Sequence, residues 1–382
     1  MLEFSILPED IQKDRTNSHN FNPQIKFENT INNKYMNRIF FALMGICLFI
    51  STAQGSKHKK IEKIFSAVEN LKIEAKYGKI QIKHWEKNEI RFEILISVEG
   101  SSDTKNETIA DNISVDFTKG DHQLLAKTVL GDFFTFKKLS NSLFNKGKIK
   151  INYTVQIPTD VNLDLVQKNG AIFLDDHKGN MKVDLSNGSF TAQDLSGENK
   201  FTITGSTFQV NSMSDSEIEF ANSHVNIQNA AKLSGESRDS EFSIHAIDNL
   251  NIKSARDKFD IKEIEYLYGS SNFSKFEIAQ MGGEIDFDLK FGHINVFNIN
   301  NLFSFIKLDS KYANIGLSFM QGCQIDYEIN HKSVKFNNST DFALTNKETA
   351  DKNTFVAKGE IGSKQAISKL NIRANNCKIR LE

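Results

Sequence analysis

The 382-residue chain contains little proline and tryptophan, and neither sign of charge is in excess. Of its three prolines, Pro8 and Pro23 lie in the first stretch, so only Pro158 interrupts the rest of the chain. Lys plus Arg number 47 and Asp plus Glu 48, a formal net charge of -1, so we expect no basic surface for nucleic acid. Phenylalanine, by contrast, is abundant at 31 residues, and bulky apolar residues with scarce proline favour β-strands.

The apolar run Ile39–Ile50 is too short to span a membrane. It has 12 residues, whereas a spanning helix needs about 20. Arg38 precedes the run, and the small residues Ser51 and Ala53 follow it at the -3 and -1 positions for cleavage after Ala53. Residues 36–53 therefore have the pattern of a secretory signal peptide. We expect export to the periplasm, the outer membrane surface or the extracellular space, without a transmembrane span in the mature chain. A single membrane anchor is the alternative.

Residues 1–35 precede this segment and are polar and rich in asparagine. Two interpretations stay open. Either Met36 is the true initiator and the extension is not translated, or the extension is a cytoplasmic tail. In both cases the fold is sought in residues 54–382.

A turn followed by a strand recurs nine times at nearly constant spacing. Apolar and polar residues alternate in each strand, as in Phe208-Gln209-Val210, which is typical of a strand with one buried face. Repeats of this period are typical of a solenoid, whose stacked coils share a core that no coil buries alone. The first apolar residues are separated by 18, 18, 17, 17, 17, 17, 18 and 21 positions, in the series Ile172, Phe190, Phe208, Val225, Phe242, Phe259, Phe276, Ile294 and Ile315.

Each repeat also contains a second alternating strand and a second turn. These second strands begin at or centre on Val183, Phe201, Ile218, Leu250, Leu267, Ile285, Ile306 and Ile325, and the unit near Leu233 is less regular. The turn residue is expected three positions before each key apolar residue, at Asn169, Asn187, Gly205, Asn222, Asp239, Arg256, Phe273, Phe291 and Tyr312. Asn, Gly and Asp tolerate positive φ in such turns. Phe291 and Tyr312 should then lie near each other on successive coils.

These patterns predict an all-β fold, a β-solenoid of about nine short coils over residues 169–329. Residues 57–168 are expected to be a β-rich N-terminal region outside the repeat register, with a helix over Lys105–Ile113 and a loop or hairpin over Phe133–Lys148. Residues 330–382 are expected to be a polar loop and a strand, Lys369–Leu381, that caps the open end of the stack. A meandering antiparallel sandwich is the alternative, and its hairpin turns would be irregularly spaced.

Four turn–strand segments carry a resemblance to a known family. They resemble the Tyr-Gly-x-Ile/Val signature of the bacterial putative-adhesin domains of the head-domain type, and the likeness covers about Lys60 to Glu328. The resemblance implies an exported β-solenoid, and it carries over no catalytic residues because none is established for the family. The segments are Tyr77-Gly78-Lys79-Ile80, Asn169-Gly170-Ala171-Ile172, Phe291-Gly292-His293-Ile294 and Tyr312-Ala313-Asn314-Ile315.

Motifs that carry chemistry are scarce. The nine histidines show no H-E-x-x-H or comparable metal spacing, and the sequence has neither a G-x-S-x-G elbow nor a phosphate loop. In the solenoid register, three histidines could approach one another along one face: His224, His245 and His293. The alternative is that they are ordinary surface or partly packed residues without a shared site. We therefore predict no metal and no cofactor.

Two carboxylates are the strongest candidates for catalysis. Parallel β-helices host polysaccharide lyases and hydrolases, which need acids that converge from neighbouring coils. Asp260 and Glu277 are 17 residues apart and should stack outward on adjacent coils, with Lys258 and Lys275 beside them. The alternative is a solvated face whose mixed charges keep an exposed sheet soluble.

The outward positions of the same strands form a polar ladder without aromatic residues, which does not favour a sugar-stacking groove. They are Thr191, Gln209, Asn226, Ser243, Asp260, Glu277 and Asn295. Phe273, Phe291 and Tyr312 at the turns are the best aromatic candidates for contact with a ligand, although we expect them to pack inward.

Two cysteines, Cys323 and Cys377, remain after the signal peptide. An oxidising compartment would permit a disulfide between them. Two buried free thiols are the alternative.

The predicted function is that of an exported, non-enzymatic β-solenoid. It would be an adhesin, or a binding or scaffold module of the bacterial cell envelope or surface, with a cell-surface glycan or an envelope protein as partner. The binding residues considered are Asp260, Glu277, Phe291 and Tyr312. One alternative is a polysaccharide-active parallel β-helix enzyme, a lyase or hydrolase. A second is a structural envelope-stress protein without a small ligand.

Overall fold

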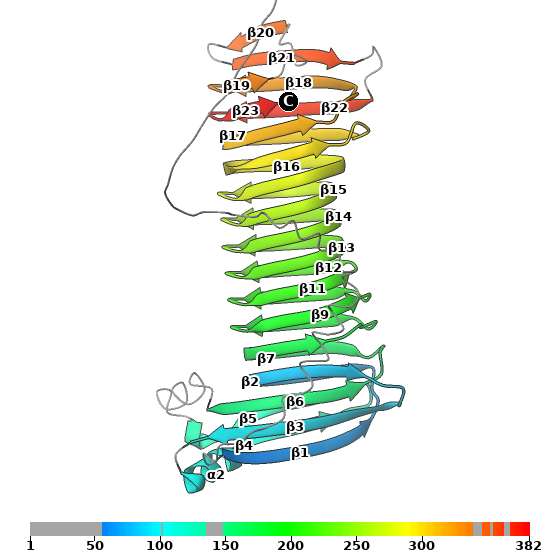
Figure 1. Ribbon diagram of the computed structural model, residues 1–382, viewed down its shortest axis with the longest axis vertical. Coiled ribbons are helices and arrows are strands. Elements are labelled where there is room, and N and C mark those ends of the chain that lie inside the picture. The colour runs from blue at the N-terminus through cyan, green and yellow to red at the C-terminus, as the bar shows by residue number, and fades with distance from the viewer. Residues whose placement is uncertain (1–55, 101, 135–147, 339–345, 352–353, 363–366) are drawn as a thin grey trace, which may run out of the picture. The chain divides into compact units, whose positions relative to one another are not determined.

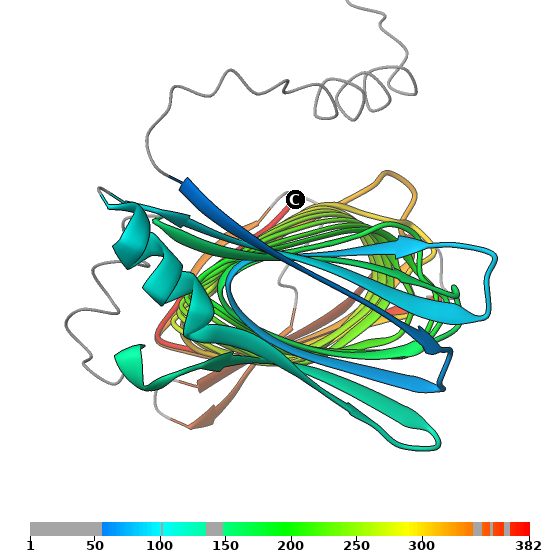
Figure 2. The ribbon, with the colours of Figure 1, turned by 90° about the horizontal axis from the view of Figure 1, so that it is seen from below.

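The computed structural model describes residues 56–100, 102–134, 148–338, 346–351, 354–362 and 367–382, all within one compact unit, Ala53–Glu382. The N-terminal extension and the predicted signal peptide lie outside the described residues. In the described part, 23 strands form one hydrogen-bonded sheet that winds into a stack of coils (Figure 1). Viewed along the stack, the coils superimpose around a shared interior (Figure 2). The predicted all-β, solenoid-like class is confirmed.

Each coil has two strands joined by a corner, which we call arm A before the corner and arm B after it. In one coil arm A is β8 (Met181–Ser186) and arm B is β9 (Ser189–Leu195). Arm A of the next coil, β10 (Asn199–Thr204), pairs with β8, and its arm B, β11 (Thr207–Met213), pairs with β9. Both pairings are parallel, so the antiparallel sandwich is wrong for this region.

Further along the stack the arms fuse into longer strands. The strands that follow are β12 (Ser216–Ala221), β13 (His224–Arg238), β14 (Glu241–Ala255), β15 (Lys258–Asn272), β16 (Lys275–Ile299) and β17 (Phe305–Phe319). In β13, β14 and β15 arm B of one coil continues into arm A of the next, whereas β16 and β17 run through a corner, at Phe291 and Tyr312.

The predicted register of arm B is confirmed. The key apolar residues from Ile172 to Phe276 pair one with the next, and Ile294 pairs with Ile315. Their side chains are at most 3% exposed. The rings of Phe242 and Phe259 stack with centroids 4.4 Å apart, and those of Phe259 and Phe276 are 4.5 Å apart. The core is therefore a column of stacked apolar side chains with one layer per coil.

Arm A has two inward ladders where the sequence suggested one. Ile218 lies opposite Gly235, whereas Leu250 lies opposite Leu233, two residues earlier along the arm. The register looked irregular near Leu233 because Gly235 has no side chain to mark the second ladder. A Cβ atom at Gly235 would lie 1.9 Å from the carbonyl oxygen of Ile218, and its φ is +143°, so the close approach of coils at this point requires glycine.

All nine predicted corner residues have positive φ. The eight that are not glycine have φ between 51° and 61°, and Gly205 has φ 59°. This strained backbone conformation is adopted even by four residues with larger side chains, Arg256, Phe273, Phe291 and Tyr312. The hydrogen-bonded arms on both sides of each corner fix the backbone there and offset the strain. Three further corners, at Tyr77, Ser333 and Asn376, have the same sign of φ, so coils also occur outside residues 169–329.

The N-terminal region is part of the stack, which corrects the expectation that residues 57–168 lie outside the register. Both arms of β2 (Asn70–His84) pair in parallel with β7 (Asn162–Leu174), and Ile80 lies opposite Ile172. On its other side β2 pairs in parallel with β5 (Gln123–Leu130) and β6 (Ile149–Ile157). The departure from the 17-residue period arises because residues 85–161 are inserted between two neighbouring coils.

Antiparallel strands close this end. β3 (Glu89–Glu99) pairs with β6, β1 (Ser56–Ser66) pairs with β3, and β4 (Ile113–Lys119) pairs with β5. The predicted helix is present as α2 (Asp103–Asp111) and is followed later by the short 3-10 helix η1 (Asp132–Phe134). Most of the expected loop over Phe133–Lys148 lies outside the described residues. No helix in the described ranges is long and apolar enough to cross a membrane.

The C-terminal end corrects the expected cap. β22 (Ser368–Asn375) lies between β17 and β18 (Ile325–Lys332) and pairs in parallel with both. β23 (Lys378–Leu381) likewise pairs with β17 and with β19 (Lys335–Asn338). The expected capping strand is therefore an inserted coil.

The cap lies in the segment expected to be a loop. β21 (Thr354–Ile361) pairs antiparallel with β18, and β20 (Asn346–Asp351) pairs antiparallel with β21. An antiparallel strand can cover the last arm without continuing the coil, and this ends the stack.

Candidate functional site

The outward face of arm B carries the polar ladder predicted from the sequence. Asp260 lies opposite Ser243 on one side and opposite Glu277 on the other, all on successive coils. This part of the face is hollowed into a shallow groove of about 740 Å³ that runs from Thr207 to His293. The structure thus brings Asp260 and Glu277 together as predicted.

Each of these carboxylates has its own partner. Lys262 Nζ lies 2.7 Å from Asp260 Oδ1. Glu277 Oε1 lies 2.7 Å from His293 Nε2 and accepts a 3.0 Å hydrogen bond from the Asn295 side chain. Lys258, expected beside the two acids, instead pairs with Glu241 one coil earlier. The two neighbouring carboxylates are thus held by separate ion pairs and hydrogen bonds on an open face.

The aromatic corner residues point outward, so the expectation that they pack inward is wrong. Phe273 is 52% exposed, Phe291 38% and Tyr312 48%. The reason is steric, since the residue after each corner occupies the inner position against the preceding coil. At Gly292 a Cβ atom would lie 2.0 Å from the carbonyl oxygen of Ser274.

These three rings form what we call the corner stack. The centroids of Phe273 and Phe291 are 4.5 Å apart with ring planes 4° from parallel, and those of Phe291 and Tyr312 are 5.3 Å apart at 9°. Phe291 and Tyr312 are thus neighbours, as predicted. Because the faces lie against one another, the corner stack presents mainly ring edges to solvent and mainly fastens adjacent coils together.

Arm A carries an aromatic pair that the sequence analysis missed. Tyr266 and Tyr268 lie on one strand, β15, with ring centroids 6.4 Å apart and planes 5° from parallel. Both are half-buried, while Leu267 between them is fully buried. The alternation Tyr266-Leu267-Tyr268 was a sufficient signal, because period 2 places both tyrosines on the outward face. The aromatic candidates predicted from the sequence lie at the corners, at Phe273, Phe291 and Tyr312, and not on arm A.

Polar groups of the next coils surround the tyrosine pair. Tyr268 donates a 2.7 Å hydrogen bond to Glu284 Oε2, and Ser304 donates a 2.6 Å hydrogen bond to Glu284 Oε1. Burial and the hydrogen bond to Glu284 raise the pKa of Tyr268 to about 12, so the hydroxyl stays protonated at neutral pH. Lys307 Nζ lies 2.9 Å from Asp286 Oδ1 on the adjoining ladder. We call Tyr266, Tyr268, Glu284 and Asp286 the tyrosine patch.

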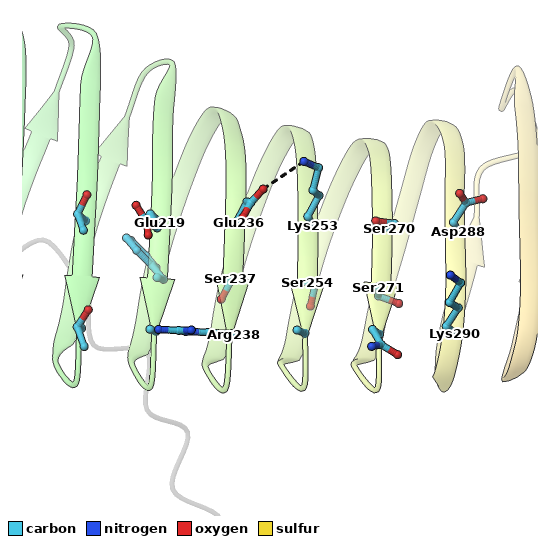
Figure 3. Close-up of a pocket in the computed structure, with 16 residues that line it drawn as sticks. Glu219, Glu236, Ser237, Arg238, Lys253, Ser254, Ser270, Ser271, Asp288 and Lys290 are labelled. Atoms are coloured by element: carbon cyan, nitrogen blue, oxygen red, sulfur yellow. Dashed lines mark hydrogen bonds and ion pairs between the residues drawn. The ribbon is translucent and has the colours of Figure 1, made fainter.

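A second shallow groove, of about 570 Å³, adjoins this patch on arm A. Figure 3 shows its side chains projecting from successive coils, with Glu236 and Lys253 joined across two coils at 3.1 Å. Ser270, two residues after Tyr268, and Asp288, two residues after Asp286, line it as well. The outward side of arm A therefore offers a continuous polar track beside an aromatic pair.

A buried polar row follows the inner side of the corners. The backbone N–H of Ser223 donates to Ser240 Oγ, that of Ser240 to Asp257 Oδ1, and that of Asp257 to Ser274 Oγ. Asp257 is 1% exposed and also accepts hydrogen bonds from Ser237, Ser254 and the Ala255 N–H. Burial raises the pKa of this carboxyl above its ordinary value. The row holds coils in register and is out of reach of a ligand.

The two cysteines do not form the disulfide considered in the sequence analysis. Both thiols are free and buried. The pairing of β18 with β22 places Ile325 beside Ser368 and Lys332 beside Asn375, so Cys323 and Cys377 lie at opposite ends of the paired arms. Cys323 donates to the Met320 carbonyl at 3.0 Å. Burial raises the pKa of both thiols.

Histidines on the arm B face do not gather into a site. His224 Nε2 lies 3.7 Å from Glu241 and His293 pairs with Glu277, so each has a different acidic partner. Among the described residues, no group of three or more His, Cys, Asp or Glu side chains is arranged to hold a metal ion.

Comparison with known proteins yields solved structures only. No family model matches the chain, and no curated protein matches it. One similar structure is a putative cell adhesion protein from Clostridium sporogenes, 10% identical, with 85% of this chain and 99% of that chain covered and a TM-score of 0.22. Another is a putative adhesin from Bacteroides fragilis, 11% identical, with 85% and 97% covered and a TM-score of 0.23.

Proposed function

We propose that the protein is an exported, non-enzymatic binding module of the bacterial cell envelope or surface, and that it binds an extended glycan along the outward face of arm A. The observation that carries the proposal is the tyrosine patch beside the polar track of Figure 3. Export rests on the predicted signal peptide and on the family resemblance of the sequence.

The chemistry of the patch fits a sugar polymer. A pyranose ring has an apolar face that packs on an aromatic side chain, and tyrosine combines such a surface with a polar tip. Carboxylates accept hydrogen bonds from sugar hydroxyls. Glu284 and Asp286 place such acceptors on the coil next to Tyr266 and Tyr268. Because the coils stack about 4.8 Å apart, a linear chain lying along the stack would meet Asn251, Tyr268 and Asp286 on successive coils.

A binding role is favoured over catalysis by the shape of the faces. The grooves on both arms are shallow, and Asp260 and Glu277 are held in pairs with Lys262 and His293. The adjacency of Asp260 and Glu277 nevertheless motivates the enzyme as the second candidate.

The test is a binding screen of the purified protein against neutral and acidic glycans, followed by titration of the best ligand. Tyr268→Ala is expected to weaken binding about tenfold or more, which corresponds to about 1.4 kcal/mol. Tyr268→Phe keeps the ring and should retain most of the affinity. The matched control is Phe291→Ala, which removes an exposed aromatic side chain from the corner stack and should leave binding unchanged.

Other outcomes would redirect the assignment. Release of reducing or unsaturated ends from a glycan, abolished in Asp260→Asn, would establish the enzyme and overturn the binding module. Failure of every glycan to bind would favour the scaffold protein without a small ligand. Binding that is lost in Asp260→Asn but kept in Tyr268→Ala would move the site to the groove on arm B.

A further inference from the structure

The corner stack belongs to a longer edge of the solenoid where the charges are of one sign. This edge comprises four residues at the corner of each of five successive coils, from the last residue of arm A to the first outward residue of arm B. Six of these residues are lysine, one is histidine and none is aspartate or glutamate. We call it the basic edge, and its residues are 272–275, 290–293, 311–314, 375–378 and 332–335.

The two coils before the basic edge carry mixed charges at the same corner. Acids occupy three of these positions, Asp239, Glu241 and Asp257. Arg256 Nε lies 2.6 Å from Asp239 Oδ1, and Lys258 Nζ lies 2.5 Å from Glu241 Oε1. The cations of these coils are therefore balanced within the protein.

The six lysines of the basic edge lack such partners. All are exposed, and none forms an ion pair with a described residue. Asp288 and Asp309 lie on the adjoining outward row of arm A, two residues before the corner lysines, and Asp309 there lies 3.9 Å from Arg373. The lysines are Lys275, Lys290, Lys311, Lys332, Lys335 and Lys378.

Four of these lysines face one another across neighbouring strands. Lys290 lies opposite Lys311, and Lys335 lies opposite Lys378. Like charges directly opposite each other are destabilising. A partner that brings negative charge to this edge would therefore relieve repulsion inside the protein as well as gain ion pairs.

The three rings of the corner stack lie among these lysines. Phe273, Phe291 and Tyr312 cover one another's faces and leave their edges exposed. Lys311 Nζ lies 6.0 Å from the centroid of the Tyr312 ring. A sugar ring or a nucleobase would need a free aromatic face on which to stack, so the corner stack does not suit either. Aromatic side chains with lysines beside them are, however, typical of segments that lie at a membrane–water interface.

The shape of the edge also favours an extended partner. The corner is the convex margin between the groove on arm A and the groove on arm B, and none of the three rings lines either groove. A convex ridge cannot enclose a small ligand, but it can rest on a broad surface. A membrane with anionic headgroups is such a surface, and each lysine that comes close to it strengthens binding about fivefold.

We propose that the basic edge docks the protein on the surface of a membrane that contains anionic lipids, with the rings of the corner stack in the headgroup layer and the lysines beside the lipid phosphates. Charge attraction and aromatic insertion are two separate contributions, and together they give a stable but reversible association. The basic edge is distinct from the tyrosine patch, so this inference does not depend on glycan binding.

The test is flotation of the protein with lipid vesicles. Residues 54–382 are used, because they contain the compact unit without the apolar run Ile39–Ile50, which could insert by itself. Vesicles of phosphatidylcholine mixed with phosphatidylglycerol should bind the protein, whereas vesicles of phosphatidylcholine alone should not. Rising salt should weaken binding, because it screens exposed charges.

Charge reversal at the edge tests the lysines. Lys290→Glu combined with Lys311→Glu should weaken binding to the mixed vesicles at least tenfold, which is about 1.4 kcal/mol. Lys182→Glu combined with Lys200→Glu is the matched control. These two lysines also lie opposite each other on successive coils and are exposed on arm A, away from the basic edge. The control makes the same change in net charge and should bind the vesicles like the wild type.

A second double variant tests the rings without changing the charge. Phe273→Asn combined with Tyr312→Asn places at these corners the residue that Asn187 and Asn222 supply at others with positive φ. Asparagine tolerates this conformation, so the variant should fold. It should bind the mixed vesicles more weakly than the wild type at every salt concentration, because the aromatic contribution is not screened.

Three outcomes would overturn the proposal. The first is that the wild type binds neither kind of vesicle. The second is that both pairs of lysine substitutions weaken binding equally, which would assign the effect to net charge and not to the basic edge. The third is binding of a soluble polyphosphate without binding of the mixed vesicles, which would identify an anionic polymer as the partner of this edge.

Discussion

The middle of the stack and its two ends are built in different ways. From β8 to β17 each coil pairs in parallel with the coils before and after it in the sequence. At the ends, out-of-order segments enter the stack: β5 and β6 lie beside β2, β22 lies between β17 and β18, and β23 lies between β17 and β19. A periodic sequence therefore specifies contacts between residues at one fixed separation along the chain, here about 17 residues. An end, by contrast, needs long-range contacts to cover an edge that has no further coil.

The largest effect is expected at the C-terminal end. Removing residues 363–382 deletes the coil between β17 and β18, so that β17 keeps only β16 as a partner and β18 keeps only β21. We expect β18, β19 and β21 to lose hydrogen-exchange protection, while β9 to β14 keep it, because each coil contacts only its neighbours. Hydrogen-exchange mass spectrometry of the truncated and full-length proteins measures this directly.

A milder variant controls for the loss of chain. Leu370 is fully buried and lies opposite Ile306 and Tyr327, so Leu370→Ala should weaken protection in the same strands and in no others. Loss of protection along the whole stack in either variant would show that middle and ends unfold as one unit, and the distinction between them would fail.

The next largest effect is expected in the middle. Phe242 is 3% exposed and stacks on Phe259, with Phe220 on its other side at 6.0 Å. Phe242→Ala should lower the free energy of unfolding by about 3–5 kcal/mol through lost burial and a cavity. Denaturant melts provide the measurement.

Its outward neighbour supplies the control. Ser243→Thr should change the free energy of unfolding by no more than about 0.5 kcal/mol. Equal and small effects at Phe242 and Ser243 would contradict the inward register of arm B.

The smallest effect concerns one coil within the regular middle. Asp257 occupies the position that Ser223, Ser240 and Ser274 occupy in neighbouring coils, and burial raises its pKa in the folded protein. A raised folded pKa means that the protonated acid is favoured by folding. Its stabilising effect is complete below the unfolded pKa and is lost as the pH rises through the folded pKa.

Asp257→Ser restores the serine row and removes this titration. The free energy of unfolding of the variant, measured against that of the wild type, should therefore rise between pH 3 and pH 7. Urea melts at several pH values give the comparison. A constant difference across this range would show that the Asp257 carboxyl does not titrate with folding. An opposite slope would mean that its hydrogen bonds outweigh its burial.

Much of the middle could be predicted from the sequence because its contacts repeat locally. The inward row from Ile172 to Phe276 and all nine corner positions agree with the structure. The ends could not be predicted in the same way. The strand near Lys369 was correctly expected to be β, but its partners β17 and β18 are set by a chain reversal that leaves no period in the sequence.

The features of the candidate sites that depend on the repeat were predictable from the sequence, and those that depend on packing at the corners were not. The adjacency of Asp260 and Glu277 followed from their 17-residue separation and is confirmed. The outward direction of Phe291 and Tyr312 could not be predicted from their spacing in the sequence. It depends on how closely the next residue, such as Gly292, approaches the backbone of the preceding coil at the inner side of the corner. The outward direction of Tyr266 and Tyr268 could have been predicted from the period-2 alternation of arm A.

The sequence by itself determined the repeat, the inward and outward alternation and the position of each corner, because these depend on spacing along one strand and on the conformational freedom of single residues. The tertiary structure alone decided the insertion of β22 and β23 into the stack, the separation of Cys323 from Cys377 and the meeting of His84 with His177. These three features join residues at long and unequal separations. Such contacts form only when the whole stack fixes which edges meet.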